Sequence, residues 1–123
     1  MNVFRLAREK FAAPLSGKGA ATYGARWNPI GVELIHTAQN RSLAMAEVAV
    51  HLSLATLPDD FVMVSIDIPD DIKIKRIEES DLPIDWQQFP HPNSTQNIGL
   101  NFVKENAFCA MMIPSVVTRG DYN

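Results

Sequence analysis

The chain has 123 residues, a length that suits one domain with a real core and is too short for two. Apolar residues make up 46% and charged residues 20%, which is typical of a soluble globular protein and argues against a disordered or membrane-spanning chain. The net charge is −3, and no segment gathers lysines and arginines, which argues against a nucleic-acid-binding surface. We therefore expect a protein that binds neither nucleic acid nor membrane directly.

The cysteine content and the N-terminus narrow the class further. The one cysteine, Cys109, excludes an internal disulfide, and its apolar neighbours predict a small buried side chain. No spacing of cysteine and histidine supports a zinc site, so we expect no metal. The first residues lack the apolar run of a signal peptide, and no segment reaches transmembrane length, which predicts a cytoplasmic protein.

The first third of the chain is expected to hold two strands separated by a long loop. Residues 3–6 form a short apolar run typical of an opening strand, with Arg5 inside it. Residues 14–31 hold four of the six glycines and are expected to be irregular, and a loop of this length in a small domain is usually functional. Its glycine-rich start does not match a phosphate-binding loop, and a flexible surface loop explains it equally well. Residues 32–37 are predicted to be a strand.

The remainder alternates predicted helices and strands. The elements expected are a helix over residues 40–55, strands over 61–68 and 72–77 that form a meander, a helix over 94–106, and a final strand over 110–117. Asn40 or Ser42 is the expected N-cap of the first helix, and Trp86 and Phe89 are expected to pack down a proline-rich loop. The strands lie too close in sequence for repeated βαβ crossovers. The predicted fold class is therefore α+β, with a small, mostly antiparallel split sheet and a few helices.

Glu47 is the one carboxylate in the otherwise apolar helical stretch of residues 43–50. At 3.6 residues per turn it shares a face with Leu43 and Val50, so the acid points where the apolar face points. Burying an ionised acid is costly unless the acid is paired or used, and a structural ion pair is the commoner outcome. The candidate partners upstream are Arg5, Tyr23, Arg26 and His36.

Arg26, Trp27 and Arg5 are candidate ligand-binding residues. An arginine fork can hold a pyrophosphate bidentately, and a neighbouring aromatic such as Trp27 can form the wall of a ring pocket. The alternative for Arg26 is structural stacking on Trp27. Arginine is almost never fully buried unless it is paired, so Arg5 either binds a ligand or pairs with Glu47.

His36 and Ser115 are weaker candidates when they are considered alone. A histidine near a core is more often a packed, hydrogen-bonded side chain than a catalyst. Ser115 follows Pro114 at the break in the last predicted strand and could hydrogen-bond a ligand amide. Its alternative is an ordinary turn serine, because no base is assigned to activate it.

Taken together, the chain resembles a RES domain, the toxin half of bacterial Res–Xre toxin–antitoxin pairs. The segments that carry the resemblance, in order and spacing over essentially the whole chain, are residues 4–6, 15–20, 23–31, 35–37, 42–48 and 114–117. The resemblance implies an ADP-ribosyltransferase-like fold and an activity that consumes NAD as substrate. It also implies a cytoplasmic Xre-type helix-turn-helix antitoxin that blocks the NAD pocket and that itself contacts the DNA.

The resemblance also assigns roles to individual residues. Arg5 and Arg26 match the NAD-contacting arginines of the family, Glu47 its catalytic acid and Ser115 its active-site serine. His36 stands where the family usually has a tyrosine, eleven residues before the acid. The expected catalytic residues are therefore Glu47, Arg26 and His36, and the expected NAD-binding residues are Arg5, Tyr23, Arg26, Trp27 and Ser115.

Three functions stay open on the sequence. The first is cleavage of the nicotinamide–ribose bond with capture by water or phosphate, in which a carboxylate on the ribose hydroxyls stabilises an oxocarbenium-like transition state. The second is transfer of ADP-ribose to a protein, and the third is an inactive antitoxin-binding module. RES domains usually continue past the segment that matches residues 121–123, so we expect a single domain over residues 1–123 that is short at its C-terminus. The oligomeric state stays open, with a homodimer as one option.

Overall fold

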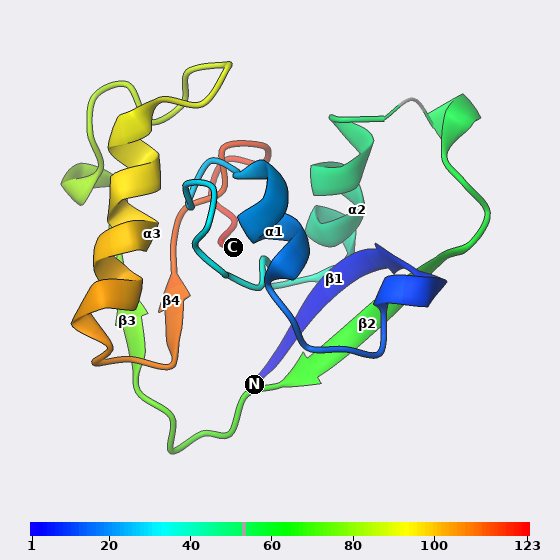
Figure 1. Ribbon diagram of the computed structural model, residues 1–123, viewed down its shortest axis with the longest axis horizontal. Coiled ribbons are helices and arrows are strands. Elements are labelled where there is room, and N and C mark those ends of the chain that lie inside the picture. The colour runs from blue at the N-terminus through cyan, green and yellow to red at the C-terminus, as the bar shows by residue number, and fades with distance from the viewer. Residues whose placement is uncertain (53) are drawn as a thin grey trace.

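The computed structural model describes residues 1–52 and 54–123 (Figure 1). The helices and strands within these residues are β1 (Asn2–Arg8), α1 (Lys18–Tyr23), α2 (Arg41–Ala49), β2 (Phe61–Asp67), β3 (Ile74–Arg76), α3 (Asn93–Glu105) and β4 (Ala110–Met112). Short 3-10 turns lie at Glu9–Phe11, Leu54–Thr56 and Glu79–Asp81. The predicted α+β class is confirmed.

The strands form two separate two-stranded sheets. β1 and β2 pair antiparallel along their whole length, with Arg5 opposite Val64. β3 and β4 pair parallel, with α3 lying between them in sequence as a single crossover. The predicted meander of residues 61–68 with 72–77 is therefore wrong, because β3 joins β4 instead of β2. Ile77, just after β3, packs with Met111 of β4 into an apolar cluster, and this burial favours the long-range pairing.

The segment of residues 32–37 is not a strand, contrary to the prediction. Beyond it, Phe4 and Ala38 form an isolated bridge, in which each backbone N–H donates to the other residue's carbonyl over 2.8 and 2.7 Å. Side chains bind carbonyl groups of the segment instead of a neighbouring strand: Asn28 donates to the Val32 oxygen and Asn123 to the Thr37 oxygen. The strand prediction for this segment is therefore wrong.

The helices follow local signals more closely. Asn40 is the N-cap of α2, since its Oδ1 accepts a hydrogen bond of 2.7 Å from the Leu43 N–H. α2 ends at Ala49 instead of Ala55, because the next turn tightens, with the His51 N–H bonded to the Val48 carbonyl. Residue 53 of the predicted helix lies outside the described residues. α3 is within one residue of its predicted bounds, whereas α1 was not expected inside the long loop.

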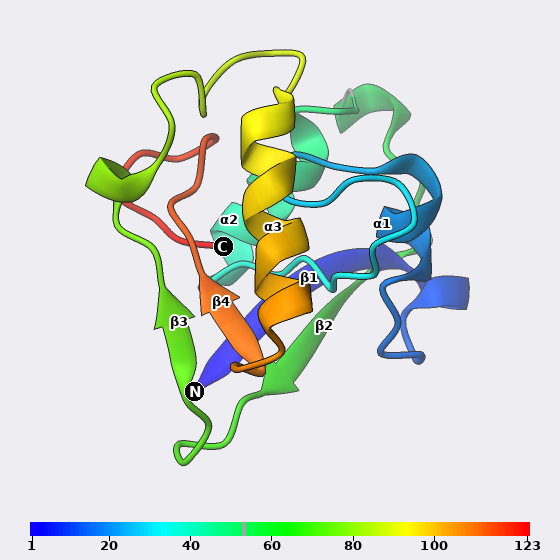
Figure 2. The same ribbon diagram turned by 60° about the vertical axis from the view of Figure 1, so that its left-hand side comes forward.

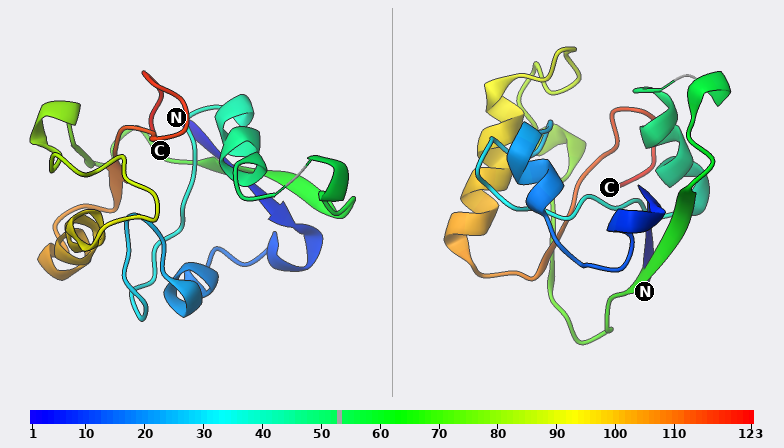
Figure 3. Two further views of the ribbon diagram at one scale, coloured as in Figure 1. Left: turned by 90° about the horizontal axis from the view of Figure 1, so that it is seen from above. Right: turned by 45° about the vertical axis from the view of Figure 1, so that its right-hand side comes forward.

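Two apolar clusters form the core. Phe4, Ala38, Leu43 and Ala44 join α2 to β1, and Trp27, Trp86 and Ile113 form the second cluster. Figures 2 and 3 show α2 against the β1–β2 sheet and α3 beside the β3–β4 sheet, with the chain between α1 and α2 running between these two halves. The expected packing of Trp86 is confirmed, but Phe89 is exposed, and so is Cys109, which was expected to be buried. Cys109 lies in the loop between α3 and β4, and it belongs to neither of the two apolar clusters.

Candidate active site

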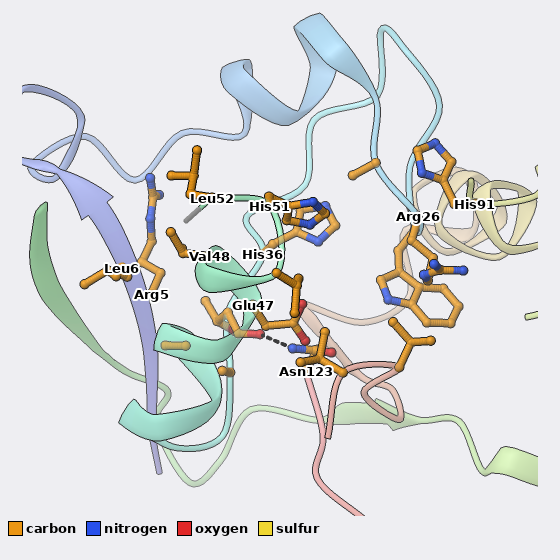
Figure 4. A pocket seen from close by; sticks show the side chains of 18 of the residues that line it. Arg5, Leu6, Arg26, His36, Glu47, Val48, His51, Leu52, His91 and Asn123 are labelled. Atoms are coloured by element: carbon orange, nitrogen blue, oxygen red, sulfur yellow. Dashed lines mark hydrogen bonds between the residues drawn. The ribbon is translucent and has the colours of Figure 1, made fainter. Parts of the chain in front are cut away.

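A cavity of about 720 Å³ opens between β1, α2, the tight turn after α1, and the C-terminal segment (Figure 4). This volume lies within the range of small-molecule and cofactor sites. Five residues that the sequence singled out line it: Arg5, Arg26, Trp27, His36 and Glu47. Ser115 is buried and does not line the cavity, but it is hydrogen-bonded to Glu47, so six of the seven predicted site residues lie at this cavity or directly behind its wall.

Glu47 and Ser115 form a hydrogen-bonded pair at this cavity. Glu47 lies on α2 and is partly buried, and its Oε1 accepts a hydrogen bond of 3.0 Å from the Ser115 hydroxyl. The Ser115 oxygen in turn accepts from the N–H groups of Val117 and Thr118, at 3.1 and 3.2 Å. The hydroxyl proton is thus directed at the acid, which makes Ser115 a positioning residue for the carboxylate. Among the described residues nothing is bonded to the second oxygen, Oε2, which is therefore available to a ligand hydroxyl.

Arg26 and Trp27 are the two central residues of a tight turn. The Asn28 N–H donates to the Ala25 carbonyl over 3.4 Å, which closes the turn, and the Ala25 N–H donates back to the Asn28 carbonyl over 2.9 Å. Trp27 is buried in the second core cluster, while Arg26 lines the cavity. α3 packs directly against this turn at Gly99, where a Cβ atom would lie only 1.6 Å from the Trp27 carbonyl oxygen. The absence of a side chain at Gly99 is therefore what lets α3 approach and support the turn.

The Arg26 guanidinium is buried and held from several sides. It donates from Nη1 to the Trp86 carbonyl over 2.6 Å, and it lies 4.6 Å from the centre of the Phe89 ring. Burial lowers the pKa of Arg26, and the negative charge of Glu47 acts in the opposite direction and raises it. Arginine nevertheless stays protonated at any physiological pH. The site therefore holds a fixed cation on the wall that carries Phe89.

Arg5 contributes a second cation from β1. In the view of Figure 4, Arg5 and Arg26 come from opposite walls of the cavity, with Glu47 and two histidine rings between them. Arg5 is partly buried and forms no ion pair among the described residues, so the alternative of an Arg5–Glu47 ion pair is not realised. Tyr23, at the end of α1, is 83% exposed and does not line the cavity. The structure does not bring Tyr23 together with the other candidates.

His36 is fixed by a hydrogen bond to a buried amide. Its Nε2 lies 2.8 Å from Oδ1 of Asn28, which is fully buried. His36 is exposed and lines the cavity, and desolvation by the protein groups packed around its ring lowers the pKa of His36. A neutral imidazole is therefore favoured in the folded protein.

Several cavity residues were missed at the sequence level. His51, Phe89, His91 and Asn123 all line the cavity. His51 lies in the turn just after α2, four residues after Glu47, and this short spacing was the one sequence signal that it lies near the acid. Nothing local in the sequence marks Phe89 or His91, since they reach the cavity from a loop distant in sequence.

The described residues contain no group of three or more His, Cys, Asp or Glu side chains that could hold a metal ion. Within the same residues, every helix is too short or too polar to span a bilayer. The chemistry available in the cavity is thus that of two cations, one hydrogen-bonded carboxylate, histidines and aromatic rings.

The RES domain family model matches residues 2–123 of this chain. Toxin Res of Yersinia enterocolitica is 31% identical over 124 residues, which cover 100% of this chain and 81% of that protein. Toxin Res of Photorhabdus laumondii is 34% identical over 124 residues, which cover 100% of this chain and 79% of that protein. The Prs ADP-ribosylating toxin of a Sphingobium species is 31% identical over 119 residues, which cover 95% of this chain and 74% of that protein. The chain belongs to the RES domain family.

Proposed function

We propose that this protein is the toxin of a toxin–antitoxin pair and that it degrades NAD by cleaving the nicotinamide–ribose bond. The observation that carries the proposal is the Glu47–Ser115 pair in one cavity with Arg26 and Arg5. Guanidinium groups on the cavity walls suit the phosphates of NAD, because arginine forks bind phosphate oxygens bidentately. Relatives named as toxins, one of them as an ADP-ribosylating toxin, support the same conclusion.

The carboxylate supplies the catalytic step in this proposal. As the bond from the ribosyl carbon to the ring nitrogen breaks, its electron pair goes to the nitrogen, and the pyridinium leaves as neutral nicotinamide. Positive charge then develops on the ribose, as it does in glycoside hydrolysis. Glu47, aligned by Ser115, would stabilise that charge through the ribose hydroxyls. Water adds to the ribosyl carbon with loss of a proton, or phosphate forms the new bond instead.

Transfer of ADP-ribose to a protein is the second candidate. It is favoured by one observation, the relative in Sphingobium that is named a Prs ADP-ribosylating toxin. Both reactions need the same NAD pocket and the same acid, and they differ only in which nucleophile reaches the ribosyl carbon. An Xre-type antitoxin is the partner proposed for either activity.

Identification of the products distinguishes these reactions. The purified protein is incubated with NAD in phosphate buffer and, separately, with NAD and cell lysate, and all products are analysed by mass spectrometry. Free ADP-ribose indicates hydrolysis, its phosphate ester indicates phosphorolysis, and a mass increase on a lysate protein indicates transfer. Intact NAD in every sample, from protein shown to be folded, would contradict the proposal and favour the inactive antitoxin-binding module.

A further inference from the structure

The orientation of the Asn28 side chain is determined by its surroundings. Its Nδ2 lies 2.9 Å from the Ala20 carbonyl oxygen, 3.3 Å from that of Pro29 and 3.1 Å from that of Val32. Carbonyl oxygens only accept hydrogen bonds, so the amide nitrogen must face them. The amide oxygen Oδ1 is therefore directed at His36, and the reverse amide orientation would place oxygen against oxygen.

The orientation of Asn28 in turn determines the tautomer of His36. Because Oδ1 of Asn28 can only accept, Nε2 of His36 must carry a proton and donate it over the distance of 2.8 Å. The ring proton that this contact requires lies on Nε2, and desolvation by the surrounding protein, which lowers the pKa of His36, disfavours a second one. Nδ1 is then an unprotonated acceptor, and it has no hydrogen-bond partner among the described residues.

The position of His36 matches the ring end of the proposed substrate. His36 lines the cavity that Glu47 also lines, and both are labelled in Figure 4. If Glu47 engages the ribose hydroxyls, the bond to the pyridine ring lies within the same part of the cavity. A neutral imidazole suits this place, because an imidazolium would repel the positively charged pyridinium.

We propose that His36 is a specificity-determining residue: its Nδ1 accepts a hydrogen bond from the carboxamide N–H of nicotinamide. This inference rests on the function proposed above and adds which feature of the dinucleotide is recognised. Analogues that lack the N–H donor leave Nδ1 unpaired when they bind, and sites that read a polar group in this way reject such analogues. The carboxamide-bearing ring is thus selected over pyridinium rings of the same shape and charge whose substituent lacks an N–H.

The test compares NAD with its 3-acetylpyridine analogue, which replaces the carboxamide by a methyl ketone. The analogue keeps the carbonyl and the overall charge but lacks the N–H, so charge repulsion with Glu47 does not enter the comparison. The ratio of kcat/KM for the two dinucleotides is measured for the wild type and for His36→Phe, which keeps an aromatic ring without an acceptor. Both kcat/KM values of a ratio are measured on the same protein sample, so the folded fraction of that sample cancels from the ratio. The difference in leaving-group reactivity between the two dinucleotides is the same for both proteins, so it cancels when the two ratios are compared.

We expect the wild type to prefer NAD by a ratio about tenfold larger than that of His36→Phe, as for loss of one discriminating hydrogen bond. Equal ratios in the two proteins, with NAD still cleaved, would overturn this inference and leave the proposed function intact. If the wild type neither binds nor cleaves either dinucleotide, both are overturned.

A spectroscopic measurement keeps the inference testable if His36→Phe does not fold. Long-range ¹H–¹⁵N spectra of the imidazoles are recorded on Glu47→Gln, which keeps His36 and binds NAD without consuming it. We expect the His36 ring to carry its proton on Nε2, and we expect the Nδ1 resonance to shift when NAD is added but not with the acetylpyridine analogue. A proton on Nδ1 in the free protein, or equal shifts with both dinucleotides, would overturn the inference.

Discussion

Replacing Gly99 by alanine is expected to destabilise the protein and to disable the cavity at the same time. The new Cβ would lie 1.6 Å from the Trp27 carbonyl oxygen, a backbone atom that cannot rotate away. Ordinary contact needs about 3.5 Å, so α3 and the Arg26–Trp27 turn would have to separate by about 2 Å. That movement would disrupt the Trp27–Trp86 stack, whose ring centroids lie 6.4 Å apart, and would displace Arg26 from the cavity wall.

The expected cost is about 3 kcal/mol of unfolding free energy, the upper end of typical overpacking penalties. For a chain of this length that corresponds to a fall in melting temperature of roughly 10 °C. Urea unfolding monitored by tryptophan fluorescence measures the free energy, and nicotinamide release from NAD by the folded fraction reports the site.

Gly19→Ala is the matched control for this substitution. Gly19 also lies in a helix, α1, but a Cβ there meets nothing within 4 Å. We expect the control to be unchanged or to gain up to about 1 kcal/mol, because alanine favours helix over glycine. If Gly99→Ala is as stable and active as Gly19→Ala, then α3 does not support the Arg26–Trp27 turn as described.

Three further outcomes are expected. Ser115→Ala should lower kcat by about tenfold with little change in KM, because Glu47 loses its hydrogen-bond donor, and an unchanged kcat would argue against a positioning role. Arg26→Lys should raise KM for NAD by at least about tenfold, since lysine offers no planar fork for the pyrophosphate, and an unaltered KM would place the phosphates elsewhere. The lowered pKa of His36 means that the unfolded state binds more protons as the pH falls below 6.5. Stability to urea should therefore decrease towards acidic pH, less steeply in His36→Gln, whereas parallel decreases would show that other groups are responsible.

Local signals made part of the fold predictable. The Asn40 cap and the apolar face of α2 lie within a few residues of each other, and the apolar, β-branched run of β2, which alternates with polar residues in its second half, identifies a strand from its own sequence. β3 pairs with a strand that lies more than 30 residues further along the chain, with Ile74 opposite Ala110. The alternation of apolar and polar residues within β3 carries no information about which strand it pairs with. The meander prediction failed for that reason.

Some residues of the candidate site could likewise be predicted from local sequence, and others could not. Glu47 is recognisable because a carboxylate on an apolar helical face needs a partner, but the partner turned out to be the hydroxyl of Ser115 instead of an arginine. Asn28 was assigned no role from the sequence. Its role in holding His36 depends on three carbonyl groups that meet only in the folded chain, so no spacing in the sequence could have revealed it.

Release of nicotinamide from NAD is the measurement that tests the central claim most directly. The wild type is compared with Glu47→Gln, which preserves the size of the side chain and an acceptor for the Ser115 hydroxyl while removing the charge. Glu79→Gln makes the same change at an exposed acid outside the cavity, and it controls for effects of a Glu-to-Gln substitution that do not involve the cavity. The account predicts release by the wild type and by Glu79→Gln, and a loss of at least about a hundredfold in Glu47→Gln, as for removal of a charge that stabilises the transition state. Equal release by folded wild type and folded Glu47→Gln would contradict it.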